Sequence, residues 1–91
     1  MQLAERSVCM MDTRVALISV VVESYEHIDE LNAILHKYNE FIIGRMGVPY
    51  RKKNISVISV AVDAPQDIIN AMSGKLGHLK GISVKTLLSK V

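Results

Sequence analysis

The chain has 91 residues, 49% of them hydrophobic, with a formal net charge of +2, so it is expected to form one small domain. A domain of this size buries only about 60–65% of the surface that its unfolded chain exposes, so association would help stabilise it. The single cysteine, Cys9, excludes an internal disulfide and a metal site built from several cysteines.

The apolar runs are shorter than the ~20 residues that span a bilayer, and the N-terminus lacks the pattern of a signal peptide. We therefore expect a cytoplasmic protein that does not bind membranes. Residues 1–13 follow neither the helical nor the strand period, which predicts a flexible N-terminal segment. One hypothesis is that translation really starts at Met10 or Met11. Residues 14–91 are predicted to form a single domain.

The first half of this domain is predicted to contain a strand, a helix and a second strand. Residues 14–23, RVALISVVVE, are rich in β-branched residues and apolar on both faces, as in a buried central strand. Ser24 is expected to cap a helix whose apolar residues recur at spacings of three and four. These residues are Ile28, Leu31, Ile34, Leu35 and Tyr38. A short strand over 41–46 and a loop over 47–54 follow.

The second half repeats the pattern. Residues 55–63, ISVISVAVD, predict another strand that is apolar on both faces. Asp63 is expected to cap a helix with Pro65 in its first turn and Gly77 at its end. The apolar stripe of this helix consists of Ile68, Ile69, Met72, Leu76 and Leu79. Residues 81–88 predict a last strand with Ile82, Val84, Thr86 and Leu88 on one face.

The order strand, helix, strand, strand, helix, strand predicts an α+β, ferredoxin-like βαββαβ plait of the ACT-like type. Right-handed crossovers place both helices on one face of a four-stranded antiparallel sheet, with the first and third strands in the centre. The residues of the first strand are apolar on both faces, so the face without helices exposes an apolar patch. Soluble monomers rarely expose such a patch. We therefore predict a homo-oligomer, a dimer or a tetramer, that packs through this face.

The remaining motifs exclude several kinds of site. GRMGVPY, residues 44–50, lacks the Lys-Ser/Thr ending of a phosphate-binding loop and is expected to form a bulge and a turn, with Arg51, Lys52 and Lys53 at the hairpin tip. The spacing of His27, His36 and His78 fits no zinc or nickel site, and we predict neither a metal nor another cofactor.

The composition also argues against nucleic-acid binding and catalysis. The central strands lack the aromatic residues with which RNA-recognition modules stack bases, and both helices are used by the plait, so direct nucleic-acid binding is not expected. Two interpretations of the lysines are open. They form a basic face that binds an anion or, more simply, they are solvated side chains that keep strand edges soluble. No serine lies near a matching histidine and carboxylate. We therefore expect no enzymatic activity.

Three segments together carry a family resemblance: GRMGVPY with the basic residues after it, ISVISVAVD, and SGKLGHLKGISVK. From Arg14 to the end, the chain resembles the family of iron-only hydrogenase system regulators, small bacterial proteins with an ACT-like ferredoxin fold. The resemblance implies a role in the maturation or expression of iron-only hydrogenase. The implied fold is similar to the regulatory domain of the nickel-responsive repressor, but this chain lacks histidine and cysteine on its second and third strands.

The leading functional hypothesis is a non-enzymatic, oligomeric regulatory module that senses a small ligand. Two glycine-containing segments offer cations and backbone amides, which suit an anionic ligand at a subunit interface. The candidate residues are Arg45, Tyr50 and Arg51 of the hairpin with Gly74, Lys75, Gly77 and His78 of the second helix. The alternative for these residues is turn formation and solubility alone. The alternative function is a structural adaptor that binds another protein through its sheet, without a ligand.

Overall fold

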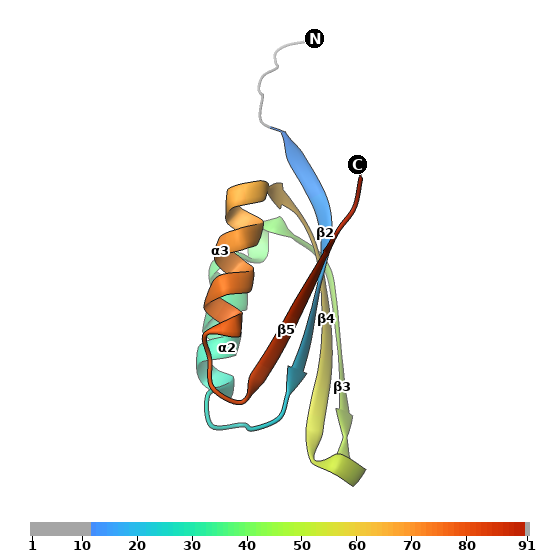
Figure 1. Ribbon diagram of the computed structural model, residues 1–91, viewed down its shortest axis with the longest axis vertical. Coiled ribbons are helices and arrows are strands. Elements are labelled where there is room, and N and C mark those ends of the chain that lie inside the picture. Colours follow the sequence, from blue (N-terminus) through green and yellow to red (C-terminus); the bar gives the residue numbers. More distant parts are fainter. Residues whose placement is uncertain (1–11, 91) are drawn as a thin grey trace.

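The computed structural model describes residues 12–90, which form a four-stranded antiparallel sheet with both helices on one face (Figure 1). The elements in chain order are β2 (Thr13–Val22), α2 (Ile28–Lys37), the 3-10 helix η1 (Asn39–Phe41), β3 (Ile42–Tyr50), the 3-10 helix η2 (Arg51–Lys53), β4 (Ile55–Pro65), α3 (Gln66–Gly77) and β5 (Ile82–Leu88). The order across the sheet is β3-β4-β2-β5. The predicted ferredoxin-like, ACT-like plait is therefore confirmed, with the first and third strands in the centre.

The predicted flexible segment, residues 1–13, lies outside the described residues except for Asp12 and Thr13. Within residues 12–90, no helix has the length and apolar character needed to cross a membrane.

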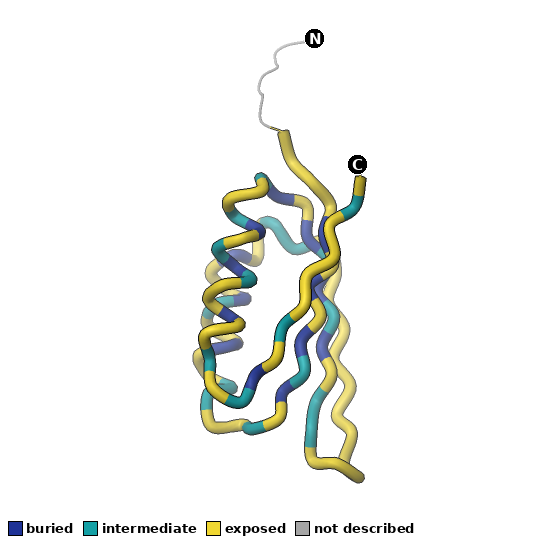
Figure 2. Tube along the Cα trace, viewed as in Figure 1, coloured by how far each residue is buried: buried dark blue, intermediate teal, exposed yellow. Residues whose placement is uncertain are grey.

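The core lies between the two helices and the sheet. Burial alternates along the two central strands (Figure 2), because successive side chains of a strand point to opposite faces. Each of the β2 residues Ala16, Ile18, Val20 and Val22 is at most 2% exposed. They pack with Val60 and Val62 of β4 and with the buried helix residues Leu31, Leu35, Ile69, Met72 and Leu76.

Helix α2 begins later than predicted, with His27 rather than Ser24 at its N-cap position. The backbone N–H groups of Glu23 and Ser24 both donate to the carbonyl of Gly81, at 2.7 and 3.1 Å. Ser24 is thereby held next to the start of β5, and its Oγ accepts a bond from the N–H of Glu26 at 3.3 Å in a local turn. The prediction that Ser24 caps the helix was wrong because this long-range contact fixes its backbone.

The β3–β4 hairpin is longer than predicted and extends past the helix layer, at the end opposite the termini (Figure 1). Strand β3 continues through Tyr50, and its register pairs Gly47 with Ile58 and Tyr50 with Ile55. The prediction of a loop from Gly47 was therefore wrong. The predicted bulge is present as a register shift between Ile42 and Gly44. The three cations form the exposed tip, η2, as expected.

Helix α3 also begins differently from the prediction. Strand β4 includes Asp63, which pairs with Val15, and continues to Pro65, the N-cap residue of α3. Asp63 is therefore a strand residue, and the prediction that it caps the helix was wrong. The helix ends at Gly77, as predicted.

Candidate functional site

Two surfaces of this fold are candidate functional sites. The first is the face of the sheet without helices, called here the open face. The strand register arranges twelve of its positions in three rows that cross all four strands, each running from β5 through β2 and β4 to β3. The rows are Leu87, Leu17, Ala61 and Gly44; Lys85, Ser19, Ser59 and Met46; and Ser83, Val21, Val57 and Val48.

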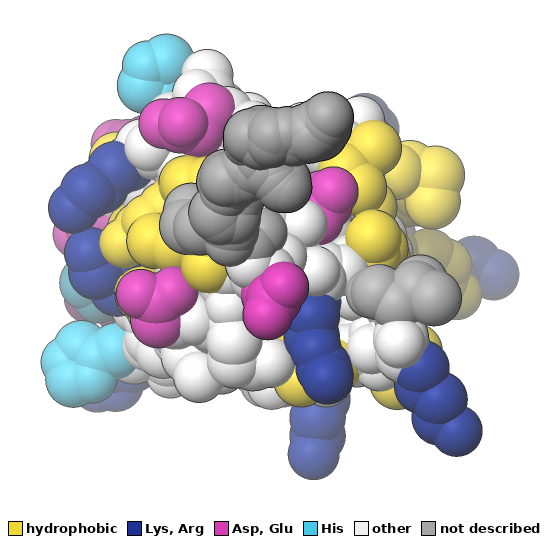
Figure 3. Space-filling model, turned by 90° about the horizontal axis from the view of Figure 1, so that it is seen from above, with side chains coloured by type: hydrophobic (Ala, Val, Ile, Leu, Met, Phe, Trp, Pro, Cys, Tyr) yellow, Lys and Arg dark blue, Asp and Glu magenta, His cyan; other side chains and the backbone are white. Residues whose placement is uncertain are grey.

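The open face is largely apolar and accessible. Leu17 is 39% exposed, Val57 44%, Met46 64% and Leu87 70%. A shallow hollow of about 360 Å³ lies on this face beside Leu17, Ala61 and Leu87. Seen from above, hydrophobic side chains reach the surface on the side of the molecule opposite the helices (Figure 3). These positions give the open face the character of an interface.

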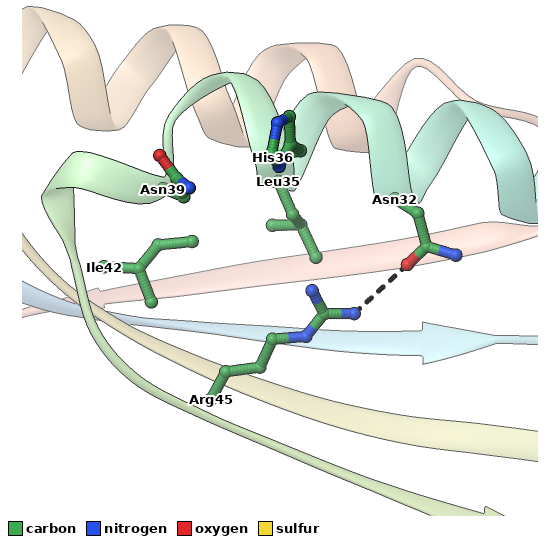
Figure 4. A pocket seen from close by; sticks show the side chains of 6 residues that line it. All are labelled: Asn32, Leu35, His36, Asn39, Ile42 and Arg45. Atoms are coloured by element: carbon green, nitrogen blue, oxygen red, sulfur yellow. Dashed lines mark hydrogen bonds between the residues drawn. The ribbon is translucent and has the colours of Figure 1, made fainter.

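The second surface is a cleft of about 520 Å³ between α2 and β3, called here the α2–β3 cleft (Figure 4). It is lined by Asn32, Leu35, His36, Asn39, Ile42 and Arg45. The first four residues lie on one side of the helix and its extension, because their spacings of three, one and three follow the helical period. Ile42 and Arg45 come from β3 and face the same way as the buried residues Val62 and Val60, with which they pair.

Arg45 gives the α2–β3 cleft its charge. Its Nη2 donates a hydrogen bond of 3.1 Å to Oδ1 of Asn32, so strand and helix are joined across the cleft (Figure 4). Among residues 12–90, no acidic residue lines the cleft and no carboxylate forms an ion pair with Arg45. A guanidinium that is oriented but not neutralised can bind an anion.

The residues predicted from the sequence lie in separate places in the single chain. Arg45 lines the α2–β3 cleft, whereas Tyr50 ends β3 and Arg51 belongs to the hairpin tip. Gly74, Lys75 and Gly77 lie in the last turns of α3, and His78 is the C-cap residue. Strands β3 and β5 form opposite edges of the sheet, and α3 contacts β5. In the described part of the chain no hydrogen bond or ion pair joins the two groups.

Lys75 has a partner of its own. Its Nζ donates to the hydroxyl of Tyr38 at 2.9 Å and lies 5.3 Å from the centre of that ring. This hydrogen bond lowers the pKa of the Tyr38 phenol from its usual 10.0, with burial opposing the shift, and raises the pKa of Lys75. Lys75 therefore joins α3 to the end of α2 and is less available to a ligand than Arg45.

Of the cleft residues, only Arg45 was predicted as a site residue, and the polar residues Asn32, His36 and Asn39 were missed. A signal was present, because these polar residues border the apolar stripe of a predicted helix at helical spacing. No local pattern predicts that Arg45 on the next strand lies opposite them, since that depends on the register of β3 with β4.

The histidines and carboxylates do not gather into a metal site in the described residues. His27 contacts Glu30 at 3.1 Å and Glu26 at 3.9 Å. The hydrogen bond from His27 lowers the pKa of the Glu30 carboxyl. Across residues 12–90, no group of three His, Cys, Asp or Glu side chains is placed to hold a metal ion.

Comparison with known proteins relates residues 14–86 to a family described as "TM1266-like: Iron-only hydrogenase system regulator, putative". Among solved structures, the uncharacterized protein TM1266 from Thermotoga maritima is similar, with 34% sequence identity and a TM-score of 0.83. The match covers 87% of this chain and 100% of the Thermotoga chain. No functionally curated protein matches the sequence.

A formyltetrahydrofolate deformylase from Pseudomonas putida KT2440 has a similar arrangement, with a TM-score of 0.58 and 10% identity. That match covers 80% of this chain and 28% of the deformylase. At this level of identity, the similarity concerns the fold alone.

Proposed function

This chain belongs to the TM1266-like family of iron-only hydrogenase system regulators, and from that premise we propose that it is a cytoplasmic, non-enzymatic regulatory module. We propose further that it works as a homodimer whose sheets pack through their open faces, and that it senses a small ligand. The observation that carries the dimer is the exposed apolar surface of the open face, which includes Leu17, Met46, Val57 and Leu87.

The first row of the open face is complementary to itself in shape. Side chains in the first row become smaller across the sheet, from Leu87 and Leu17 to Ala61 and Gly44. A two-fold axis parallel to the strands, between β2 and β4, would place Leu17 over the partner subunit's Ala61. The same axis would place Leu87 over the partner subunit's Gly44. Large side chains would then meet small ones, as close packing of two aligned sheets requires.

The charges of the rows also permit this arrangement. Lys85 is the one charged residue among the twelve positions of the rows, and it lies on the edge strand β5. The other charge on the described open face near these rows is Asp63, which pairs with Val15 beyond the first row, near the end of β4. The two-fold axis would place the two copies of Lys85 at opposite edges of the dimer. Neither ammonium group would therefore be buried at the centre or lie next to its like-charged copy.

Native mass spectrometry and size-exclusion chromatography with light scattering test the dimer. We expect the wild type to be dimeric and Leu17→Lys to be a folded monomer, because a lysine at the centre of the interface would bury an unpaired charge. Ala33→Lys is the matched control, since Ala33 is exposed on α2 and should leave the dimer intact. A monomeric wild type, or a Leu17→Lys dimer of unchanged affinity, would contradict the proposal.

The regulatory role is tested in a host that contains iron-only hydrogenase. Deleting the gene should change hydrogen evolution, and hydrogenase transcript levels should separate an effect on expression from an effect on maturation. We expect the wild type and Ala33→Lys to restore the original activity and Leu17→Lys to fail. Hydrogen evolution that is the same with and without the gene would argue against a role in this system.

The second candidate function is a structural adaptor that binds another protein through the same open face. The exposed apolar surface favours binding of a protein partner, which is either a second copy of this chain or a different protein. Native mass spectrometry of the untagged protein from its own host separates them. A homo-oligomer with a defined extra mass supports ligand sensing, whereas a complex with a different polypeptide and no extra mass supports the adaptor.

A further inference from the structure

We propose that the α2–β3 cleft binds a small organic acid with one carboxylate and a short branched apolar body. The inference rests on the proposed ligand-sensing function and deepens it by naming the site and the class of ligand. Arg45 would bind the carboxylate, and Leu35 and Ile42 would contact the apolar body.

The position of Arg45 orients its guanidinium to bind a carboxylate. The hydrogen bond to Asn32 uses one of the five N–H groups of the guanidinium and holds the group between strand and helix. The other N–H groups have no carboxylate partner in the described residues. A planar fork of N–H donors matches the two oxygens of a carboxylate, and prior orientation lowers the entropy cost of binding.

The charge around the cleft favours a ligand with a single negative charge. In the described part of the chain, one guanidinium lines the cleft and no second Lys or Arg side chain does. The cleft also lies along the second half of α2, which ends at Lys37. The carboxyl end of a helix carries a partial negative charge, whereas phosphate sites commonly use the opposite end. A dianion such as phosphate is therefore a poorer match than a monocarboxylate.

The rest of the lining suits a short apolar body. Leu35 is 1% exposed and lies at the base of the cleft with the half-buried Ile42 (Figure 4). His36 and Asn39 lie on the helix side, across from Arg45, and provide hydrogen-bonding groups. The volume of about 520 Å³ is within the range of small-molecule sites, and Leu35 and Ile42 are the apolar members of the described lining.

The position of Arg45 gives binding a route to the rest of the molecule. Its neighbours Gly44 and Met46 belong to the rows of the open face, because alternate residues of a strand face opposite sides of the sheet. A carboxylate that binds Arg45 would hold the same edge strand that contributes to the proposed dimer. The proposed ligand site and the proposed dimer interface thus use consecutive residues of β3.

Titration of the ¹⁵N-labelled protein, followed by NMR, tests the site. The probes are acetate, 3-methylbutanoate and 4-methylpentanoate, with neutral 4-methylpentanamide and inorganic phosphate as comparisons. We expect 4-methylpentanoate to shift the side-chain signals of Asn32, Asn39 and Arg45. Each CH₂ added to the carboxylate should tighten binding about three- to fourfold, because it adds apolar contact.

Two variants separate the cleft from general charge effects. Arg45→Met removes the guanidinium and should weaken binding of 4-methylpentanoate about tenfold or more, the usual effect of losing a charged hydrogen bond. Lys52→Met removes a cation from the exposed hairpin tip, outside the candidate site, and should leave the affinity unchanged. Circular dichroism of both variants should match that of the wild type.

Binding that survives in Arg45→Met, equal binding of 4-methylpentanamide, or phosphate that binds the cleft when carboxylates do not would overturn the assignment. So would signals that shift only away from the cleft. The oligomeric state is measured on the same samples. A dimer without carboxylate binding refutes the cleft assignment and leaves the regulatory dimer standing, whereas a monomer that binds the carboxylate refutes the dimer alone.

Discussion

The two faces of the sheet contain the same kinds of aliphatic residue, but these residues are buried on one face and exposed on the other. On β2, Ile18 and Val20 are at most 1% exposed beneath the helices, whereas Val15 and Leu17 are 37% and 39% exposed on the open face. The difference does not come from hydrophobicity, since both sets are aliphatic. It arises because both crossover helices pack on one side of the sheet.

This comparison shows that an apolar residue stabilises the fold only where something covers it. Residues of the helix-covered face stabilise the fold within one chain, whereas residues of the open face would add stability only within an assembly. Substitutions on the two faces should therefore differ in size and in their dependence on protein concentration.

The largest expected difference is between the neighbours Ile18 and Leu17. Ile18→Ala should lower the free energy of unfolding by about 2–5 kcal/mol, because it removes buried methyl groups and leaves a cavity. Leu17→Ala, measured at dilutions where the protein is monomeric, should change it by only about 0.5 kcal/mol. Urea denaturation followed by circular dichroism measures both.

The effect of Leu17→Ala should depend on protein concentration. At high concentration, Leu17→Ala should lose the stabilisation that the wild type gains from dimer formation. Equal losses for both variants at high dilution would mean that the two faces do not differ as described.

A smaller effect is expected from the glycine that fixes the register of β5 against β2. Gly81 has a φ of +80°, and a Cβ atom at this position would lie 2.6 Å from the Cβ of Ser24. Gly81→Ala should therefore cost about 1–3 kcal/mol of stability. Its control is Gly74→Ala in α3, where an added Cβ meets nothing within 4 Å.

Gly74→Ala should stabilise the protein by about 0.5–1 kcal/mol, because alanine is the better helix former. Thermal and urea unfolding of both variants measure the two effects. If Gly81→Ala left the free energy of unfolding unchanged, the contact between Gly81 and Ser24 would not be what fixes the register of β5 against β2.

The smallest effect concerns the polar contact at the margin of the helix layer. Lys75 lowers the pKa of Tyr38 by its hydrogen bond, and the pKa of Lys75 is raised in turn. The Tyr38 contribution to stability therefore appears as pH rises through its lowered pKa, and the Lys75 contribution is lost as pH rises through its raised pKa. Their combined contribution should be greatest at pH 10.0–10.5, the interval between the usual pKa values of the two groups.

NMR titration of the tyrosine rings, assigned by Tyr→Phe variants, measures the Tyr38 pKa. Lys75→Met should raise it, while Lys85→Met, on the open face, should leave it unchanged. An unchanged Tyr38 pKa in Lys75→Met would show that the contact contributes nothing to the ionisation.

Local signals predicted the elements well but placed some of their ends wrongly. The stripe of α2 that contains Leu31 and Leu35 was correct because helical spacing is a property of the segment itself. The start of that helix was wrong because Ser24 is held by Gly81, far along the chain. Strand β3 was predicted too short because its glycines and proline suggested a loop, whereas pairing with β4 keeps it extended.

The candidate site was predictable only in part. Arg45 was selected as a cation near a glycine-containing segment, but its partner Asn32 was not, since nothing in the local pattern relates a helix residue to the following strand. The grouping of the hairpin with the end of α3 remains a prediction that requires a second subunit, because in one chain these segments belong to opposite edges of the sheet.

The order of the elements, the central positions of β2 and β4, and the presence of two apolar faces could all be predicted from the amino-acid sequence. These properties follow from periodicity, chain connectivity and the handedness of crossovers, all of which act within or between adjacent segments. Only the tertiary structure decided which β2 residues face the helices, how far β3 extends, and that Arg45 meets Asn32 in a cleft. Those outcomes depend on strand register, which is set by pairing between residues far apart in the chain.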